Sequence, residues 1–223
     1  MLVEFDRQFL DESHRLIGGI DEAGRGPLAG PVVCAMAIMP LDDKIDGVND
    51  SKKLTPKKRD VLYNEIISKA ISYSVAIIDE RTIDRINILN ATKQGMNDCI
   101  KNSPIRPDLI LVDAVNGLNA DVEIFPIIKG DAKSYNIACA SIIAKVTRDR
   151  LMMELASIYP EYGFDKHKGY GTAYHIESLK KFGPCKIHRA TFIKNFINQE
   201  EMTNFFKKIL INLLTFVCFV HII

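Results

Sequence analysis

The feature that most constrains this chain is an apolar run that ends in two adjacent acids and a glycine turn. The run 16–20 leads directly into Asp21 and Glu22, and the tripeptide Gly24-Arg25-Gly26 follows. Continuous apolar character is typical of a strand buried on both faces. Glycines after such a strand favour a turn that brings bare backbone amides close to a ligand. We therefore predict that the acids hold a divalent metal here, beside a phosphodiester.

Composition allows one globular domain with a sizeable core and a small appendage, because the chain has 223 residues and is 47% hydrophobic. The net charge of +1 does not indicate nucleic-acid binding, so only a local cluster of basic residues can do so. The five cysteines form no CxxC pair, which favours buried thiols in a reducing compartment over disulfides or a zinc site. Acids near the N-terminus argue against a signal peptide. We expect a cytoplasmic protein.

Apolar runs predict five strands, and periodicity and capping signals predict the helices. The predicted strands are 16–22, 32–39, 73–78, 109–112 and 122–128. The predicted helices are a short helix or arm within 1–15, a helix capped by Thr55, and helices over 80–101, 134–159 and 172–182. Gly95 weakens the prediction over 80–101. The short first connection predicts an antiparallel pair. Since the strands first follow one another and then alternate with helices, we predict an α/β fold with a mixed sheet flanked by helices.

Further acids follow two later strands. Asp113 follows the run 109–112, and Asp131 follows the last predicted strand. If these carboxylates meet Asp21 and Glu22 at one edge of the sheet, they repel one another and raise their pKa values unless cations neutralise them. Hard oxygen ligands suit Mg²⁺ or Mn²⁺. The alternative for each acid is a turn or a helix cap, which is our interpretation of Asp79-Glu80.

Three basic or aromatic elements have both a functional and a plain interpretation. The segment 50–54 precedes a helix with lysines in its first turn, which opposes the helix dipole and favours an anionic partner, although a solvated charged face is the alternative. Lys133 follows Asp131 and can neutralise a phosphate, while Ser134 can cap the next helix. Tyr170 lies between two glycines and can stack on a sugar or base, or simply pack on the surface.

Other polar residues receive default interpretations. Arg148 and Arg150 are expected to form surface ion pairs with Asp149 or Glu154. The histidines lack metal-ligand spacing, and we assign no role to His167, His175 and His188.

Six stretches resemble, in the same order, the signature of the ribonuclease HII family. They are 20–32, 50–54, 129–134, 140–149, 167–172 and 188–189. The resemblance covers about 16–192. It implies a ribonuclease H-like five-stranded mixed sheet flanked by helices in 1–160, a small C-terminal helical substrate-binding portion in 161–200, and an apolar tail in 201–223.

The resemblance also implies an activity. Members are metal-dependent endoribonucleases that use two Mn²⁺ or Mg²⁺ ions. They cleave the RNA strand of RNA–DNA hybrids, and single ribonucleotides in duplex DNA. The cut lies 5′ to the ribonucleotide and leaves a 3′-hydroxyl and a 5′-phosphate. We expect RNA–DNA hybrid and ribonucleotide-containing duplex DNA as partners, a monomer, and no obligate protein partner.

Residue by residue, the resemblance assigns roles to matching positions. The catalytic, metal-binding acids are Asp21, Glu22, Asp113 and Asp131. The backbone clamp on the ribonucleotide and its 2′-hydroxyl is Gly24, Arg25 and Gly26. The aromatic platform for the following deoxyribose is Tyr170. The phosphate-contacting positions are Ser51, Lys52, Lys53, Lys133 and Ser134.

Two alternatives remain. The sister family, ribonuclease HIII, carries an additional N-terminal substrate-binding domain, for which we expect no room ahead of Leu16. A non-catalytic nucleic-acid-binding protein on the same fold is disfavoured by the complete acidic set.

The match fades after Phe192. The apolar run 209–223 would span about 22 Å as a helix, against roughly 30 Å for a bilayer core. We favour packing on the domain or on another chain over a poorly ordered tail or membrane contact.

Overall fold

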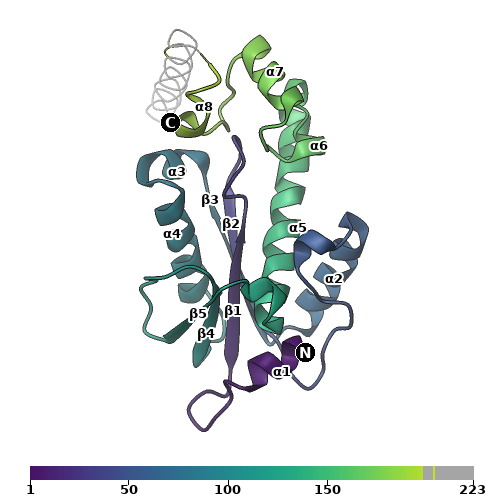
Figure 1. Ribbon diagram of the computed structural model, residues 1–223, viewed down its shortest axis with the longest axis vertical. Coiled ribbons are helices and arrows are strands. Elements are labelled where there is room, and N and C mark those ends of the chain that lie inside the picture. Colours follow the sequence, from purple (N-terminus) through teal and green to yellow (C-terminus); the bar gives the residue numbers. More distant parts are fainter. Residues whose placement is uncertain (198–202, 204–223) are drawn as a thin grey trace, which may run out of the picture. The chain divides into compact units, whose positions relative to one another are not determined.

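The structure is a computed structural model that describes residues 1–197 and 203. The chain divides into two compact units, which are described separately (Figure 1). Unit 1 comprises Met1–Arg25 and Pro31–Arg150, and unit 2 comprises Gly26–Gly30 and the chain from Leu151 onward. The predictions for the tail at 201–223 lie outside the described residues, apart from Thr203.

Unit 1 contains a mixed five-stranded sheet within the described part of the chain. Its strands are β1 (Ile17–Ala23), β2 (Val32–Ile38), β3 (Ser72–Ile78), β4 (Leu109–Asp113) and β5 (Glu123–Ile127), in the order β3-β2-β1-β4-β5. The first three strands pair antiparallel, whereas β4 runs parallel to both β1 and β5. The predicted mixed sheet, its antiparallel first pair and the approximate strand bounds are confirmed.

Helices accompany the sheet and form most of unit 2. They are α1 (Leu2–Arg7), α2 (Pro56–Lys69), α3 (Glu80–Ile86), α4 (Ile88–Lys101), α5 (Tyr135–Ile158), α6 (Phe164–His167), α7 (Ala173–Phe182) and α8 (Ala190–Ile193). Short 3₁₀ helices are η1 (Ser51–Lys53), η2 (Gly130–Ala132) and η3 (Pro160–Tyr162). Thr55 caps α2 as predicted, because its side chain accepts from the Lys58 amide.

The prediction of one helix over 80–101 is wrong at Asn87. This residue has φ of 66°, which ends α3, and its side chain accepts from the Asn90 amide to start α4. Gly95, in contrast, continues α4. A Cβ at Gly95 would lie 2.7 Å from the Cys34 Sγ, so the glycine permits close packing on β2 and does not break the helix.

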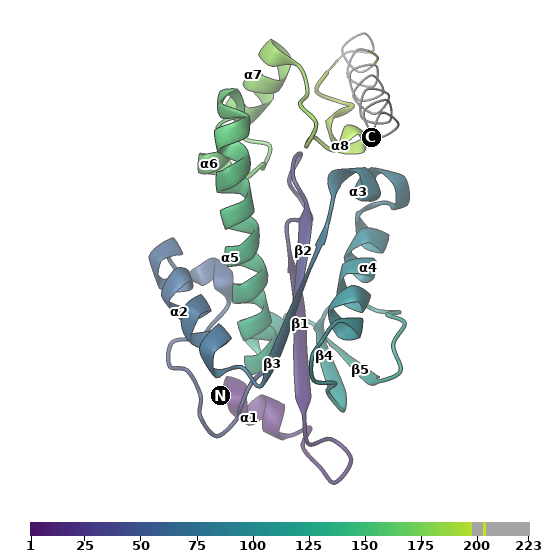
Figure 2. The ribbon, with the colours of Figure 1, turned by 180° about the vertical axis from the view of Figure 1, so that it is seen from behind.

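Helices cover both faces of the sheet in unit 1. Helix α4 lies on one face, while α2 and the first part of α5 lie on the other (Figures 1 and 2). The first face buries Ile20 and Met36 against Met96. The second buries alanines of β2 against Leu62 and Ile66 of α2 and the apolar side of α5. Burial on both faces explains the continuous apolar runs of the central strands.

The backbone of α5 approaches β1 closely at Gly19. A Cβ on this residue would lie 2.1 Å from the carbonyl carbon of Asn136. Two contacts hold the start of α5 at this position. The Ser134 hydroxyl accepts from the Ile137 amide, which confirms the predicted cap, and the buried Asp6 carboxylate accepts from the Asn136 amide at 2.8 Å. Helix α1 thereby anchors the N-terminus of α5.

Unit 2 has its own small core. It buries Ala29, Met152, Tyr162, Phe164 and Ile187. The segment Gly26–Gly30 belongs to this unit through backbone hydrogen bonds. The Leu28 amide donates to the Gly169 carbonyl at 2.8 Å, and the Gly30 amide donates to the Ile187 carbonyl at 2.8 Å. The early glycine turn therefore enters a core built from residues near the end of the described chain.

Two general expectations bear on the described residues. The thiols of Cys34, Cys99 and Cys139 are free and buried, as predicted, and Cys185 is free and half-buried. No helix in the described part of the chain combines the length and the apolar character needed to cross a membrane.

We predict that Gly19→Ala destabilises the protein by about 3 kcal/mol or more, because the new methyl group meets backbone atoms that cannot turn away. Gly18→Ala on the opposite face is the matched control. Its Cβ would lie 3.3 Å from the Pro107 side chain, so we expect a loss of about 1 kcal/mol or less. Urea unfolding measures both values, and equal losses would contradict a specific helix–strand contact at Gly19.

Candidate active site

Two parallel strand ends place acids side by side. The pairing of β1 with β4 ends where Ile20 lies opposite Val112, so the next residues on the two strands, Asp21 and Asp113, follow it on neighbouring strands. Asp21 is buried, and Asp113 is half-buried. The predicted convergence of these two carboxylates at one sheet edge is therefore a result of parallel register.

The third acid arrives through a turn after β5. Lys129 has φ of 57°, which directs the chain into η2 and places Asp131 at its centre. The Gly130 amide donates to the Asp113 carboxylate at 2.7 Å and ties the turn to the end of β4. A side chain at this position would be crowded, since a Cβ on Gly130 would lie 2.6 Å from the Ile137 Cδ1. Glycine therefore permits the close approach of the turn.

The three aspartates form a group suited to a cation. One carboxylate oxygen each from Asp21, Asp113 and Asp131 lies within 4.8 Å of the others. These are hard oxygen donors, which suit Mg²⁺ or Mn²⁺. Among the described residues this is the one cluster of potential ligands that meets this spacing.

Glu22 takes a different orientation. Successive strand residues face opposite sides of a sheet, so its side chain leaves the face that Asp21 uses. One of its oxygens lies 3.4 Å from the Arg25 guanidinium, while the other, Oε2, is buried without a hydrogen-bond partner. A buried carboxylate oxygen without a partner is costly unless a further donor or cation arrives. Glu22 thus has one oxygen available to a ligand.

The electrostatics of the site reflect burial and mutual repulsion. Burial raises the pKa of Asp21 well above its usual value, and the charges of Glu22 and Asp113 raise it further. Burial also raises the pKa of Glu22, although the neighbouring charge of Arg25 lowers this pKa in part. Burial raises the pKa of Asp113 as well, and repulsion from Asp131 raises it further. A bound cation would relieve this repulsion.

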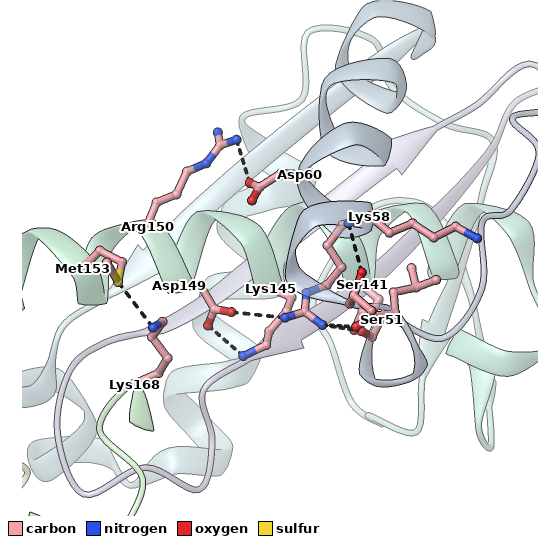
Figure 3. A network of polar contacts seen from close by, with 12 residues as sticks. Ser51, Lys58, Asp60, Ser141, Lys145, Asp149, Arg150, Met153 and Lys168 are labelled. Carbon is pink, nitrogen blue, oxygen red and sulfur yellow. Dashed lines mark hydrogen bonds and ion pairs between the residues drawn. The ribbon is translucent and has the colours of Figure 1, made fainter. Parts of the chain in front are cut away.

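A hydroxyl pair links the acids to helix α5 and to η1. The Ser141 hydroxyl of α5 lies 2.9 Å from the Ser51 hydroxyl (Figure 3). Ser141 also hydrogen-bonds the Asp21 carboxylate, which lowers the pKa of Asp21 in part. Ser51 is buried, and its carbonyl accepts from the Arg59 guanidinium at 3.0 Å. Ser134, the helix cap, is buried as well. Both predicted phosphate-contacting serines therefore have hydroxyls engaged within the chain, and their contact with substrate stays a prediction.

The lysines of the site are exposed. The Lys52 Nζ lies 3.3 Å from the Asp131 carboxylate. The turn that carries Lys52 is held by a hydrogen bond in which the Asp50 carboxylate accepts from the Lys52 amide. Lys53 and Lys133 are exposed on neighbouring turns. The structure thus brings Lys52 to the acidic group and leaves Lys53 and Lys133 open to solvent.

The expectation that Arg148 forms a surface ion pair is wrong. Its side chain is buried, and its Nε donates to the Pro31 carbonyl at 2.9 Å. It fills the space beside Gly24, where a Cβ would lie 2.0 Å from the Arg148 Nε. Gly24 also has φ of 99°, so this position needs glycine for two reasons. Arg148 thereby supports the turn that follows the acids.

Three other charged residues of α5 form ion pairs. Asp149 pairs with Lys145 at 2.7 Å and with Arg59 at 3.7 Å, while Arg150 pairs with Asp60 of α2 at 3.0 Å (Figure 3). Arg150 therefore has an exposed ion pair as expected, but with another helix.

Two predicted substrate-contacting residues belong to unit 2. Gly26 is exposed, and a Cβ on it would lie 3.6 Å from the Tyr170 ring. Tyr170 is 44% exposed as a whole residue, so it is open to a ligand. Unit 2 thus places the last glycine of the clamp tripeptide beside the predicted aromatic platform.

Sequence reasoning missed Ser141 and the inward position of Arg148. Both lie in the stretch 140–149 that resembles the family signature, but the sequence of a long helix does not show which of its polar side chains turn inward. The spacing along α5 offers one clue. Gly19 contacts the helix at Asn136–Ile137. Asp21 lies two strand residues (about 6.6 Å) beyond this contact, and Ser141 lies about one helical turn (about 5.4 Å) beyond it.

Comparisons with known proteins agree with this geometry. A protein-family model described as Ribonuclease HII matches residues 18–195. The chain is 55% identical over 195 residues to ribonuclease HII of Caldicellulosiruptor bescii, covering 87% of this chain and 95% of that relative.

Solved structures show the same fold. Ribonuclease H2 of Pyrococcus horikoshii OT3 superimposes with a TM-score of 0.71 at 29% identity, covering 86% of this chain and 99% of that chain. Ribonuclease HII of Archaeoglobus fulgidus, solved in complex with PCNA, has a TM-score of 0.67 at 25% identity, covering 82% of this chain and 97% of that chain.

We predict that Asp21→Asn stabilises the metal-free protein, by about 1 kcal/mol, because it removes one buried charge from a repelling group. Since the folded-state pKa of Asp21 is raised, its contribution to stability falls as pH rises, and the advantage of the variant should grow as the pH rises above 3.8, the usual pKa of an aspartate. Thermal unfolding in the presence of a chelator measures this stabilisation. The same measurement with added Mg²⁺ should show that the metal raises the unfolding temperature of the wild type but not that of Asp21→Asn.

The matched control is Asp46→Asn, which removes an exposed carboxylate that lies 3.5 Å from the Lys44 amine. It should leave the unfolding temperature and its response to Mg²⁺ unchanged. A destabilised Asp21→Asn that still responds to Mg²⁺ would contradict the cation site.

Proposed function

Because the chain belongs to the ribonuclease HII family, and is therefore a metal-dependent ribonuclease H acting on RNA–DNA hybrids, we propose that it also cuts duplex DNA at single embedded ribonucleotides. The proposed cut lies 5′ to the ribonucleotide and leaves a 3′-hydroxyl and a 5′-phosphate. The observation that carries this proposal is the union of two features at the end of β1: a group of three aspartates, and a glycine turn supported by Arg148.

Asp21, Asp113 and Asp131 are the proposed metal ligands, and Glu22 completes the set with its unpartnered oxygen. Two divalent ions, Mg²⁺ or Mn²⁺, would supply Lewis acidity that activates a water and stabilises the leaving oxygen. Ser141 orients the Asp21 carboxylate through its hydrogen bond, and the Gly130 amide orients Asp113 in the same way. The chain therefore holds these carboxylates in place before a cation binds.

The glycine turn is the proposed sugar-selecting element. The backbone of Gly24, Arg25 and Gly26 is proposed to contact the 2′-hydroxyl, because the two glycines carry no side chain that would cover it. The 2′-hydroxyl is the group that distinguishes ribose from deoxyribose at a given position. Backbone groups read this hydroxyl without reading the base. Cleavage independent of base sequence follows.

Tyr170 and the exposed lysines are the proposed contacts along the substrate. The open face of the Tyr170 ring suits stacking on the deoxyribose after the ribonucleotide. Lys53 and Lys133 suit phosphates, because they are exposed and Lys53 lies at the end of η1. Lys52 is shared between the acids and the substrate, since its amine already lies near Asp131.

We expect Asp113→Asn to lose about 100-fold or more in kcat on a duplex with one ribonucleotide, while the wild type cuts at the 5′ side of that nucleotide with Mg²⁺ or Mn²⁺. Mapping of the products on a sequencing gel measures the cleavage site and the rate. Asp46→Asn serves as the control and should cut at the wild-type rate. Persisting activity of Asp113→Asn would refute the metal assignment, and a wild type that binds without cutting would favour a non-catalytic binding protein.

We expect Lys53→Ala to reduce the salt dependence of binding, because one phosphate contact fewer releases fewer counterions. The slope of log affinity against log salt should become shallower by about 0.9. Lys53 is a cleaner test than Lys52, whose removal also unpairs Asp131. Binding to a ribonucleotide-containing duplex without divalent metal measures the slope, with exposed Lys101→Ala as the control. A slope equal to that of the control would mean that Lys53 misses the phosphates.

A further inference from the structure

The histidines to which the sequence assigns no role form a cluster in unit 2. The rings of His167 and His175 stack with their centroids 4.6 Å apart, and the His175 Nε2 lies 3.1 Å from the His188 Nε2. His175 and His188 are buried. The three residues come from α6, α7 and the segment before α8, so only the tertiary fold brings them together.

Hydrogen bonds determine the tautomer of each ring. The His175 Nδ1 lies 2.9 Å from the Tyr170 carbonyl, which can only accept, so His175 carries its proton on Nδ1. Its Nε2 must then accept from the Nε2–H of His188. The remaining nitrogen of His188, Nδ1, accepts from the Cys185 amide at 2.9 Å. The result is a directed chain of hydrogen bonds from Cys185 to Tyr170.

His167 adds a second, parallel connection. Its Nε2 lies 2.7 Å from the Tyr162 carbonyl and donates to it, so its Nδ1 accepts from the Gly169 amide at 3.2 Å. Burial keeps all three rings neutral. It lowers the pKa of His175 to about 4 and of His188 to about 3, and it also lowers the pKa of His167.

The loop that these bonds hold needs external support. Lys168 has φ of 52° and Gly169 has φ of 86°, so two consecutive residues before Tyr170 adopt the left-handed region. The Gly169 carbonyl also accepts from the Leu28 amide, and the Leu28 carbonyl accepts from the Arg189 amide at 2.9 Å. The segment Gly26–Gly30 therefore lies between the same two stretches that the histidines connect.

We infer that His175 and His188 are positioning residues: their hydrogen-bond chain fixes the backbone of Tyr170 against the segment Gly26–Gly30 and so sets the preference for a ribonucleotide followed by DNA. This inference rests on the proposed function of Tyr170 as the platform for the following deoxyribose. It adds that recognition of the junction depends on one particular proton, that on the His175 Nδ1.

Two substitutions at His175 separate positioning from simple core packing. Asn places its amide nitrogen near the Nδ1 position, so His175→Asn keeps the donor to the Tyr170 carbonyl and loses the bond to His188. Gln reaches the Nε2 position, so His175→Gln keeps the bond to His188 and loses the donor to Tyr170. A residue that only filled the core would be impaired similarly by both changes.

The measurement is the ratio of kcat/KM on a duplex with one ribonucleotide to kcat/KM on an all-RNA strand hybrid. This ratio is independent of the fraction of active enzyme, so partial misfolding does not affect it. We expect His175→Gln and Tyr170→Ala each to lower the ratio about tenfold, and His175→Asn to stay within about twofold of the wild type. Equal ratios for the two His175 variants would overturn the inference.

A second measurement needs no substrate. Long-range ¹H–¹⁵N correlation spectra of the full chain report which ring nitrogen of each histidine is protonated. We expect His175 protonated on Nδ1, and His188 and His167 protonated on Nε2. A proton on the His175 Nε2 would overturn the inference whatever the enzyme cleaves. An unchanged ratio for Tyr170→Ala, with the expected tautomers present, would instead refute the proposed function of Tyr170.

Discussion

The close contact between α5 and β1 at Gly19 is the constraint on which the acidic site depends. Because the glycine has no side chain, the helix backbone rests directly on the strand, and the two elements run past the site with fixed spacing. One helical turn and two strand residues cover nearly the same length, so the contact at Gly19 delivers Ser141 to Asp21. The parallel register of β1 and β4 then adds Asp113, and the turn after β5 adds Asp131. Backbone packing, and not attraction between the side chains, assembles the carboxylates.

This assembly is electrostatically unfavourable in the absence of a cation. Burial and mutual repulsion raise the pKa values of Asp21, Glu22 and Asp113, and Glu22 retains a buried oxygen without a partner. Two neutral donors, the Ser141 hydroxyl and the Gly130 amide, hold the acids in place against this repulsion. Two cations, Lys52 beside Asp131 and Arg25 beside Glu22, offset part of the negative charge. A site of this kind gains from cation binding mainly because the arrangement of its ligands already exists.

The elements whose signal is local could be predicted from the sequence, and those whose position depends on tertiary contacts could not. The sheet, the acids at its strand ends and the Thr55 cap follow from apolar runs and capping rules. The break at Asn87 was missed because an asparagine with positive φ has no strong pattern around it. The burial of Arg148 was missed because its partner, Pro31, lies 117 residues earlier in the sequence. The histidine cluster was missed because its three rings come from different elements, which only the tertiary fold brings together.

The packing of Arg148 beside Gly24 has a consequence for how this turn can vary. The guanidinium occupies the volume that any larger residue at position 24 would need, and its Nε satisfies the carbonyl of Pro31. The two positions therefore form one steric unit. A library that randomises residue 24 alone would return only glycine, and shortening residue 148 to make room would leave a buried carbonyl without its donor. A redesign of sugar selectivity at this turn has to begin in helix α5, more than a hundred residues further along the chain.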